Sequence, residues 1–206
     1  MDAAELQAEL EAANVAAARA AVGCVPLHAA SVETQVGVVA FAGRSHSGKS
    51  TLTAAAVLAG YPYVADEITA VSPDDLSVRP FHRPIGLRRG GASAVGVDYP
   101  TSPDDRYELV YPWVLGDEHA RSEGGTLAGI VLVEWDASSE PTIADVAPSW
   151  ALTALTQHAV VHDGVYAPAF DGLNRIVRRV PIVRMTYSTT AQSLRLLAEL
   201  VERWRP

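Results

Sequence analysis

The feature that most constrains this chain is the motif G-x-x-x-x-G-K-S at residues 43–50, which Thr51 follows. The apolar run at residues 36–42 comes directly before it and favours a buried strand. The Ala-rich run at residues 51–59 comes directly after it and favours a helix. A strand, a glycine-rich loop and a helix are the context in which this motif cradles phosphate groups.

Each part of the motif suits an anion for a physical reason. Gly43 and Gly48 let the backbone bend so that its N–H groups point inward, and the helix start adds the positive end of its dipole. Lys49 is the only lysine of the chain; it suits the terminal phosphates of a nucleotide, and the Ser50 hydroxyl suits Mg²⁺. A glycine-rich turn without a ligand is the alternative. The predicted nucleotide-binding residues are Gly43, Arg44, Ser45, His46, Ser47, Gly48, Lys49, Ser50 and Thr51.

Two acids, Asp66 and Glu67, stand at the end of the next predicted strand, residues 61–65. The sequence Tyr-Val-Ala before them is apolar, so the acids emerge from the core beside the glycine-rich loop. One carboxylate there can accept a proton from a hydroxyl nucleophile, and another can hold Mg²⁺ directly or through water. A helix cap or a solvated turn is the alternative.

The motifs between residues 25 and 72 together resemble the catalytic domain of the HPr kinase/phosphorylase family. The similar segments are Leu-His-Ala-Ala at residues 27–30, the glycine-rich motif and Val-Ala-Asp-Glu at residues 64–67. The resemblance implies that Lys49 and the loop amides bind ATP phosphates and that Ser50, with Asp66 and Glu67, holds Mg²⁺. It also implies that Asp66 is the base on an acceptor serine and that His28 lies near the phosphates, so that Asp66, His28 and Lys49 are catalytic.

The chain departs from this family in three places. Glu67 stands where the family has a second Asp, and the family's E-I-R-G-x-G signature has only a loose echo at residues 86–91. Some 24 residues precede the similar region, where the bacterial enzymes have a separate domain. The chain is therefore more similar to the small stand-alone relatives, including the lasso peptide precursor kinases, than to enzymes that act on HPr as hexamers.

Composition limits the partners and the compartment. The formal net charge of −8 argues against nucleic acid and against an anionic membrane surface as main partners. The single cysteine, Cys24, leaves no internal disulfide and no cysteine metal site. We identify no apolar span of 18 residues and no signal peptide in the sequence, so we expect a cytoplasmic protein. The composition is compatible with an oligomer as well as with a monomer.

The remaining pattern predicts alternating helices and strands. Helices are expected at residues 3–21, 148–160, 164–180 and 190–204, and strands at residues 27–33, 68–71, 127–136, 141–146 and 181–187. The strand at residues 27–33 should form a hairpin with the strand at residues 36–42. Residues 76–91 carry two prolines and predict edge strands with a loop. Residues 91–126 predict a long irregular flap that binds the acceptor.

Several other side chains are weaker candidates. Arg88 and Arg89 suit a phosphate or an acidic peptide, although a solvated loop explains them equally well. Glu134 ends a central strand, where either a metal-supporting acid or a plain strand exit fits. His158 and His162 have the spacing of a metal pair, but surface histidines are the favoured interpretation. The late basic cluster favours a solvated helix face: Arg175, Arg178 and Arg179.

These observations predict an α/β fold with a P-loop, a mixed sheet and flanking helices, like HPr kinase and phosphoenolpyruvate carboxykinase. Residues 1–24 would form an N-terminal helix, and residues 25–206 a single kinase-like domain. The predicted function is ATP- and Mg²⁺-dependent transfer of the γ-phosphoryl group to a serine hydroxyl of a peptide or small protein. The alternatives are a kinase for a small molecule such as free serine and an ATP-binding regulator without catalysis.

Overall fold

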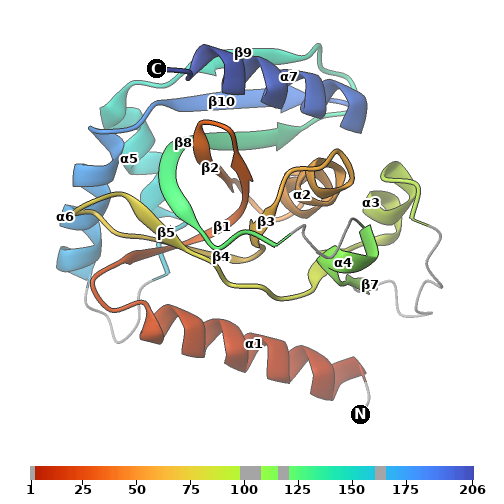
Figure 1. Ribbon diagram of the computed structural model, residues 1–206, viewed down its shortest axis with the longest axis horizontal. Coiled ribbons are helices and arrows are strands. Elements are labelled where there is room, and N and C mark those ends of the chain that lie inside the picture. Colours follow the sequence, from red (N-terminus) through yellow and green to blue (C-terminus); the bar gives the residue numbers. More distant parts are fainter. Residues whose placement is uncertain (1–2, 98–107, 116–120, 161–165) are drawn as a thin grey trace.

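The computed structural model describes residues 3–97, 108–115, 121–160 and 166–206 (Figure 1). It is a mixed α/β structure whose sheet is mostly antiparallel. The strands are β1 (Val25–Thr34), β2 (Gly37–Ala42), β3 (Tyr63–Ala65), β4 (Ile68–Val71), β5 (Ser77–Arg79), β6 (Ile85–Leu87), β7 (Glu108–Val110), β8 (Gly125–Trp135), β9 (Thr142–Asp145) and β10 (Ile182–Tyr187). The helices are α1 (Ala3–Ala20), α2 (Lys49–Leu58), α3 (Arg89–Ala94), α4 (Pro112–Leu115), α5 (Pro148–Thr156), α6 (Tyr166–Val177) and α7 (Thr190–Arg203).

Two long strands, β1 and β8, organise the sheet. β1 pairs antiparallel with β4 through its first half and with β2 and β3 through its second half. β8 pairs antiparallel with β5 at its start and then parallel with both β2 and β10. Because β2 and β8 run in the same direction, their carboxyl ends meet at one edge of the sheet, where the glycine-rich motif follows β2.

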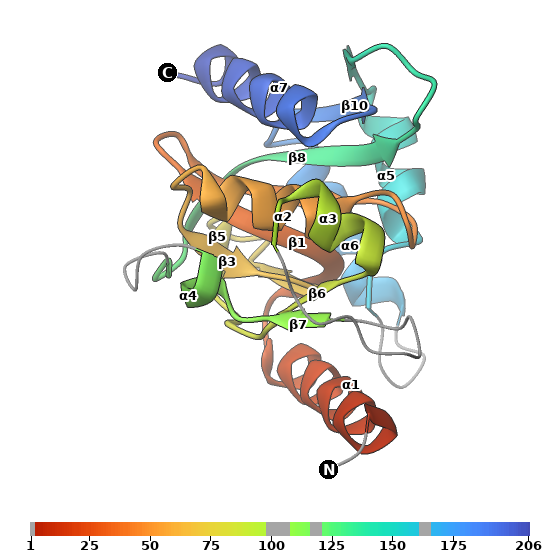
Figure 2. The ribbon, with the colours of Figure 1, turned by 90° about the vertical axis from the view of Figure 1, so that its right-hand side faces the viewer.

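Helices cover the two faces of this sheet. Alternate strand residues pack against α2 and α7 on one face, which fits the predicted amphipathic helix at the end of the chain. The intervening strand residues pack against α5 and α6 on the other face. Figure 2 shows α7 and α1 at opposite ends of the molecule.

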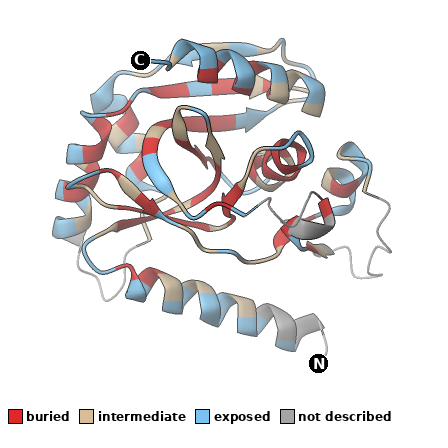
Figure 3. Ribbon diagram, viewed as in Figure 1, coloured by how far each residue is buried: buried red, intermediate tan, exposed pale blue. Residues whose placement is uncertain are grey.

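Helix α2 is enclosed on two sides because its residues are small. Leu52 and Ala56 pack toward the sheet, whereas Ala54 and Val57 pack toward β6, β7, α3 and α4. Residues 52–57 are all buried, as the red colour of α2 in Figure 3 shows. An Ala-rich helix permits this close approach of neighbours on both sides, and the arrangement fixes the loop from which the helix emerges.

The structure confirms the hairpin of β1 and β2 and the strand β8, and it corrects two other predictions. β5 is not an edge strand, because it lies between β4 and β8, whereas β6 is one, because it pairs only with β7 among the described strands. Both prolines of the stretch, Pro80 and Pro84, lie between β5 and β6. Residues 91–126 are not wholly irregular, because α3, β7 and α4 fall in or overlap this stretch, while residues 98–107 and 116–120 lie outside the described residues. None of the described helices has the length and apolar character to cross a bilayer.

Candidate functional site

The glycine-rich loop, residues 43–50, connects β2 to α2 under tight steric constraint. Gly48 has φ of 94°, and a Cβ there would meet the Tyr187 hydroxyl. A Cβ on Gly43 would lie 2.5 Å from Ser47 Oγ and 2.7 Å from the Val133 carbonyl oxygen. Glycine is therefore required at both positions, at Gly48 by backbone conformation as well as by space.

Lys49 begins α2 and turns back over the loop. Its ammonium group donates hydrogen bonds to the carbonyl oxygens of Gly43 at 2.9 Å and Arg44 at 3.1 Å. Burial lowers the pKa of Lys49, while the nearby carboxylates of Glu67 and Asp66 act in the opposite direction. The side chain thus places its ammonium group beside the loop backbone, where a bound anion would lie.

Two features of the loop fit a phosphate group. The Ser47 hydroxyl is buried and has no hydrogen-bond partner among the described residues, which is an arrangement that usually costs free energy. The first N–H groups of α2 follow Gly48, which has no side chain to cap them. Backbone N–H groups, a free hydroxyl and an ammonium group together form an anion-binding cradle.

Asp66 lies directly behind this loop at the end of β3. Its side chain is buried, and its carboxylate accepts hydrogen bonds from the Ser50 hydroxyl at 3.1 Å and from the Gly86 N–H at 3.2 Å. Burial raises the pKa of Asp66 to about 6, and the nearby Glu67 carboxylate adds to this rise. Among the described residues that line the adjacent pocket, Ser50 is present and Asp66 is not, so the Asp66 carboxylate lies behind Ser50 rather than in the pocket wall.

Glu67 is the acid that faces the pocket. Its backbone is left-handed, with φ of 83°, a conformation that costs a non-glycine residue free energy. Its carboxylate accepts a hydrogen bond from His28 Nε2 at 3.0 Å. This hydrogen bond is the main cause of the lowered pKa of Glu67. The structure thus brings together His28, Asp66 and Glu67, which the sequence had separated by up to 39 positions.

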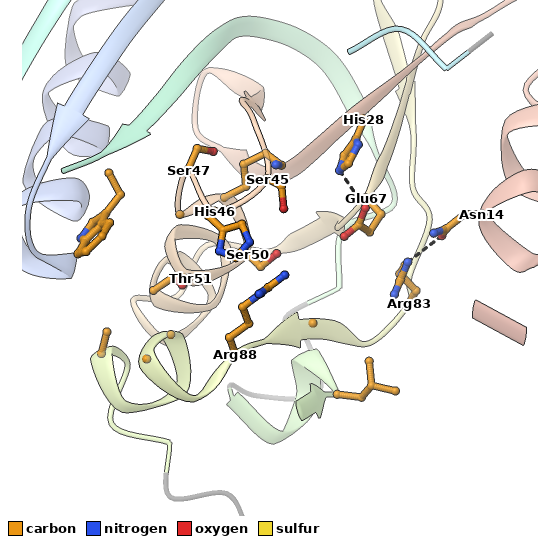
Figure 4. Close-up of a pocket in the computed structure, with 18 of the residues that line it drawn as sticks. Asn14, His28, Ser45, His46, Ser47, Ser50, Thr51, Glu67, Arg83 and Arg88 are labelled. Atoms are coloured by element: carbon orange, nitrogen blue, oxygen red, sulfur yellow. Dashed lines mark hydrogen bonds and ion pairs between the residues drawn. The ribbon is translucent and has the colours of Figure 1, made fainter. Parts of the chain in front are cut away.

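The pocket has a volume of about 610 Å³ and three kinds of wall. The glycine-rich loop and α2 form its floor, with His28 and Glu67 beside them (Figure 4). Arg83 and Arg88 approach from the segment around β6, and Figure 4 shows Arg88 extending toward Ser50. Helix α1 closes one side through Glu11 and Asn14.

Ser50 and Asp66 are the residues that best fit Mg²⁺. A hydroxyl and a carboxylate supply the oxygen atoms that Mg²⁺ prefers, and phosphate and water usually complete its coordination. Over the described ranges, no group of three or more His, Cys, Asp or Glu side chains could hold a metal ion by itself. The donor set therefore fits a metal that is shared with a phosphate ligand rather than one held by protein alone.

The weaker candidates divide between the pocket and the surface. Arg88 lines the pocket, whereas Arg89 and Glu134 are not among the described lining residues, and Glu134 is exposed. Arg175 and Arg179 bind the turn before β5 through Asp74 and Pro73, away from the pocket.

His158 is not the surface residue that the sequence favoured. It is half-buried, and its carbonyl oxygen accepts a hydrogen bond from the N–H of His28 at 2.6 Å. Burial lowers the pKa of His158, and the cations Lys49, His28 and Arg44 lower it further. His162, its predicted partner, lies outside the described residues.

Sequence reasoning missed several residues of the pocket wall, among them Glu11, Asn14, Arg83 and Trp135. The first two lie on α1, where composition alone gives no sign of a site. Trp135 could have been found, because it ends the strand that runs parallel to β2, and such strand ends gather at one edge of a sheet.

Comparisons with known proteins give likenesses in structure. No family model matches the chain, and no curated protein matches its sequence. The structure is similar to that of the Hpr(Ser) kinase/phosphatase from Coxiella burnetii, with a TM-score of 0.39 and 12% sequence identity over 86% of this chain and 93% of that chain. A likeness at this TM-score and identity supports neither the family nor the activity of this chain, and both stay predictions.

Proposed function

We propose that this chain is an ATP- and Mg²⁺-dependent kinase that transfers the γ-phosphoryl group to a serine hydroxyl of a peptide or small protein. The observation that carries the proposal is the buried carboxylate of Asp66, hydrogen-bonded to Ser50 of a loop built to receive phosphate. A loop that only held a nucleotide would not need a buried acid behind it and a second acid, Glu67, at the pocket wall. The serine and peptide character of the acceptor rests on the sequence resemblance.

The cradle residues neutralise and position the phosphates in this proposal. The loop N–H groups and the Ser47 hydroxyl hold phosphate oxygens, and Lys49 exchanges its carbonyl partners for them. Ser50 and Asp66 would hold Mg²⁺, which when bound neutralises phosphate charge. Arg88 approaches from the opposite wall with a further positive charge. Positioning and charge neutralisation supply most of the catalysis in this class of reaction.

A carboxylate then takes the proton of the acceptor. The hydroxyl oxygen forms a bond to the γ-phosphorus, the bond from that phosphorus to the β–γ bridging oxygen breaks, and ADP leaves. Asp66 accepts the hydroxyl proton, and its pKa of about 6 makes it a stronger base than an ordinary aspartate. Glu67 is the alternative base because it faces the pocket, but its lowered pKa makes it a weaker one.

The first experiment measures ADP formation from Mg·ATP for the wild type, Asp66→Asn and Glu67→Gln, with water, free serine or a pool of serine-containing peptides as acceptor. We expect wild-type turnover to rise with a peptide and to fall by about 10²–10⁴-fold in Asp66→Asn. Stimulation by free serine instead would establish a small-molecule kinase. Tight ATP binding without turnover under any addition would establish the regulator and refute the proposal.

The Mg²⁺ dependence separates the two roles of Asp66. If Asp66 is the base, raising Mg²⁺ does not restore the activity of Asp66→Asn. If it only supports the metal, a higher Mg²⁺ concentration recovers much of the rate, and Glu67→Gln then becomes the variant without a base.

A further inference from the structure

The pocket continues past the glycine-rich loop on the side away from His28, Glu67 and Arg83. There its lining consists of Trp135 at the end of β8 and of small residues at α3, namely Gly90, Gly91 and Ala94. Nothing in the phosphate cradle or in the proton transfer uses this part of the pocket. Among the described lining residues, Trp135 carries the only indole or phenyl ring.

Trp135 is fixed in place and still half exposed. Its backbone N–H donates to the carbonyl oxygen of Ser47 in the glycine-rich loop at 3.0 Å. Its indole N–H donates to the carbonyl oxygen of Ser188 at 3.0 Å, yet 50% of the residue remains accessible to solvent. The hydrogen bonds of the backbone N–H and the indole N–H fix this residue, and its ring is exposed to the pocket. An aromatic ring in this position can stack against a planar ligand.

The wall formed by α3 is hydrogen-bonded to the segment that also accepts the hydrogen bond of the Trp135 indole. The Thr190 hydroxyl, two residues after Ser188, donates to the carbonyl oxygen of Ala94 at 3.1 Å. Gly91 approaches Thr51 so closely that a Cβ on it would lie 2.6 Å from the Thr51 hydroxyl. Gly90 and Ala94 carry no large side chain, and nothing lies within 4 Å of a Cβ on Gly90, so the α3 side of the pocket has room for a planar group.

The direction of a bound nucleotide follows from the site described above. The reacting γ-phosphate must lie beside Asp66, and the remaining phosphates lie over the loop and the start of α2. The nucleoside therefore leaves the cradle on the other side, past Thr51. That side is where Trp135 and α3 line the pocket.

We propose that Trp135 is the stacking platform for the nucleobase of the phosphoryl donor, with the small residues of α3 on the opposite face of the base. This inference rests on the proposed function. Stacking uses the π-face that every base has, so it favours a nucleotide over inorganic pyrophosphate or tripolyphosphate while discriminating little between adenine and guanine.

The test compares a ligand that has a base with one that has none. Isothermal titration calorimetry gives the dissociation constants of Mg·ATP and of Mg·tripolyphosphate for the wild type, Trp135→Ala and Trp135→Phe. The matched control is Trp150→Ala, because Trp150 is 52% exposed on α5 and does not line the pocket. Thermal melts check that each variant is folded.

We expect Trp135→Ala to weaken Mg·ATP binding by about 5- to 100-fold and to leave tripolyphosphate binding unchanged. Trp135→Phe should retain most of the affinity for ATP, and Trp150→Ala all of it. Equal losses for both ligands would show that Trp135 only supports the loop through Ser47, and unchanged ATP binding would exclude stacking; either result overturns the inference while the proposed function stands. A wild type that binds neither ligand overturns both.

Discussion

Gly48 and Gly60 have nearly the same left-handed backbone, with φ of 94° and 92°, but different surroundings. A Cβ on Gly48 would collide with the Tyr187 hydroxyl, whereas nothing lies within 4 Å of a Cβ on Gly60. The two positions therefore separate the cost of the backbone conformation from the cost of crowding. Gly60 follows α2, and Gly48 precedes it, so both substitutions act at the ends of one helix.

We predict that Gly60→Ala lowers the free energy of unfolding by about 1 kcal/mol, which is the usual cost of a left-handed alanine. Gly48→Ala should cost about 3 kcal/mol, because the collision with Tyr187 adds strain of the kind found in overpacked sites. Urea unfolding of both variants provides the measurement. In a Tyr187→Phe background the cost of Gly48→Ala should shrink toward that of Gly60→Ala, and equal costs in both backgrounds would contradict the steric explanation.

The sequence predicted which residue types form the site better than it predicted how these residues are placed in the structure. The glycine spacing and the chemistry of Lys49 led to the loop, because both are local properties of the chain. The burial of Asp66 could not be predicted from the local sequence, since its carboxylate is covered by distant parts of the chain such as β6, whose Gly86 N–H donates to it. Arg83 in particular carries no local sign of its position near both acids.

Helix α1 is the element whose contribution to the site was hidden. Its Asn14 side-chain oxygen accepts a hydrogen bond from the guanidinium group of Arg83 at 2.8 Å, and Glu11 and Asn14 line the pocket. Among the described side chains of α1, only Ala18 is buried, and Ala21 is buried just after the helix. The hydrogen bond between Asn14 and Arg83 therefore matters for how α1 closes its side of the pocket.

We predict that Asn14→Ala raises the KM for the acceptor several-fold and leaves the dissociation constant of Mg·ATP unchanged. Loss of the hydrogen bond frees α1 from Arg83, which lies on the same side of the pocket as Asn14 and Glu67 (Figure 4). A hydrogen bond to a charged group contributes about 1.5–3 kcal/mol. Steady-state kinetics and calorimetry provide the two readouts. Asn14→Asp is the matched control, because a carboxylate can still accept from Arg83, and an equal defect in that variant would contradict this explanation.

The order of elements was more predictable than their pairing. Apolar runs and helix periodicity locate β2, β8, β10 and α7, since these patterns reflect burial on one or two faces. Strand neighbours are set by contacts between distant segments, such as the pairing of β5 with both β4 and β8. A pattern with two prolines therefore suggested edge strands, although both prolines lie between β5 and β6 and leave β5 free to pair on both sides.

At the scale of the whole molecule, the described buried charged side chains lie together at the candidate site. The net charge is −8, and among the described residues the buried charged side chains are Lys49 and Asp66. Burying a carboxylate opposes folding unless hydrogen bonds and cations compensate, and the raised pKa of Asp66 shows that compensation is incomplete. The buried carboxylate therefore lowers the free energy of unfolding, by an amount that depends on pH.

The sign of this dependence follows from proton linkage. The pKa of Asp66 rises from 3.8 to about 6 on folding, so the folded state binds more protons between these values. The contribution of this group to stability is fully present below about pH 4 and is lost as the pH rises through about 6. The difference between the two pKa values corresponds to about 3 kcal/mol as an upper figure.

We predict that Asp66→Asn, which should abolish transfer, makes the protein more stable than the wild type by about 1–3 kcal/mol at pH 8, since a neutral amide removes the buried charge. Near pH 4 the difference should fall toward zero, because Asp66 is then protonated in the folded state and about half protonated in the unfolded state. Urea unfolding at both pH values provides the measurement.

Asp75 serves as a control, because folding lowers its pKa instead of raising it. Hydrogen bonds from the Ser77 N–H and from serine hydroxyls lower its pKa to about 2, so its carboxylate stabilises the fold above pH 4 and loses this effect as the pH falls toward 2. Asp75→Asn should therefore be less stable than the wild type at pH 8. If Asp66→Asn were also destabilised at pH 8, the hydrogen bonds from Ser50 and Gly86 would outweigh the burial of the charge. Asp66 would then hold the loop in shape at a net gain in stability, and its pKa would have to lie closer to the ordinary value.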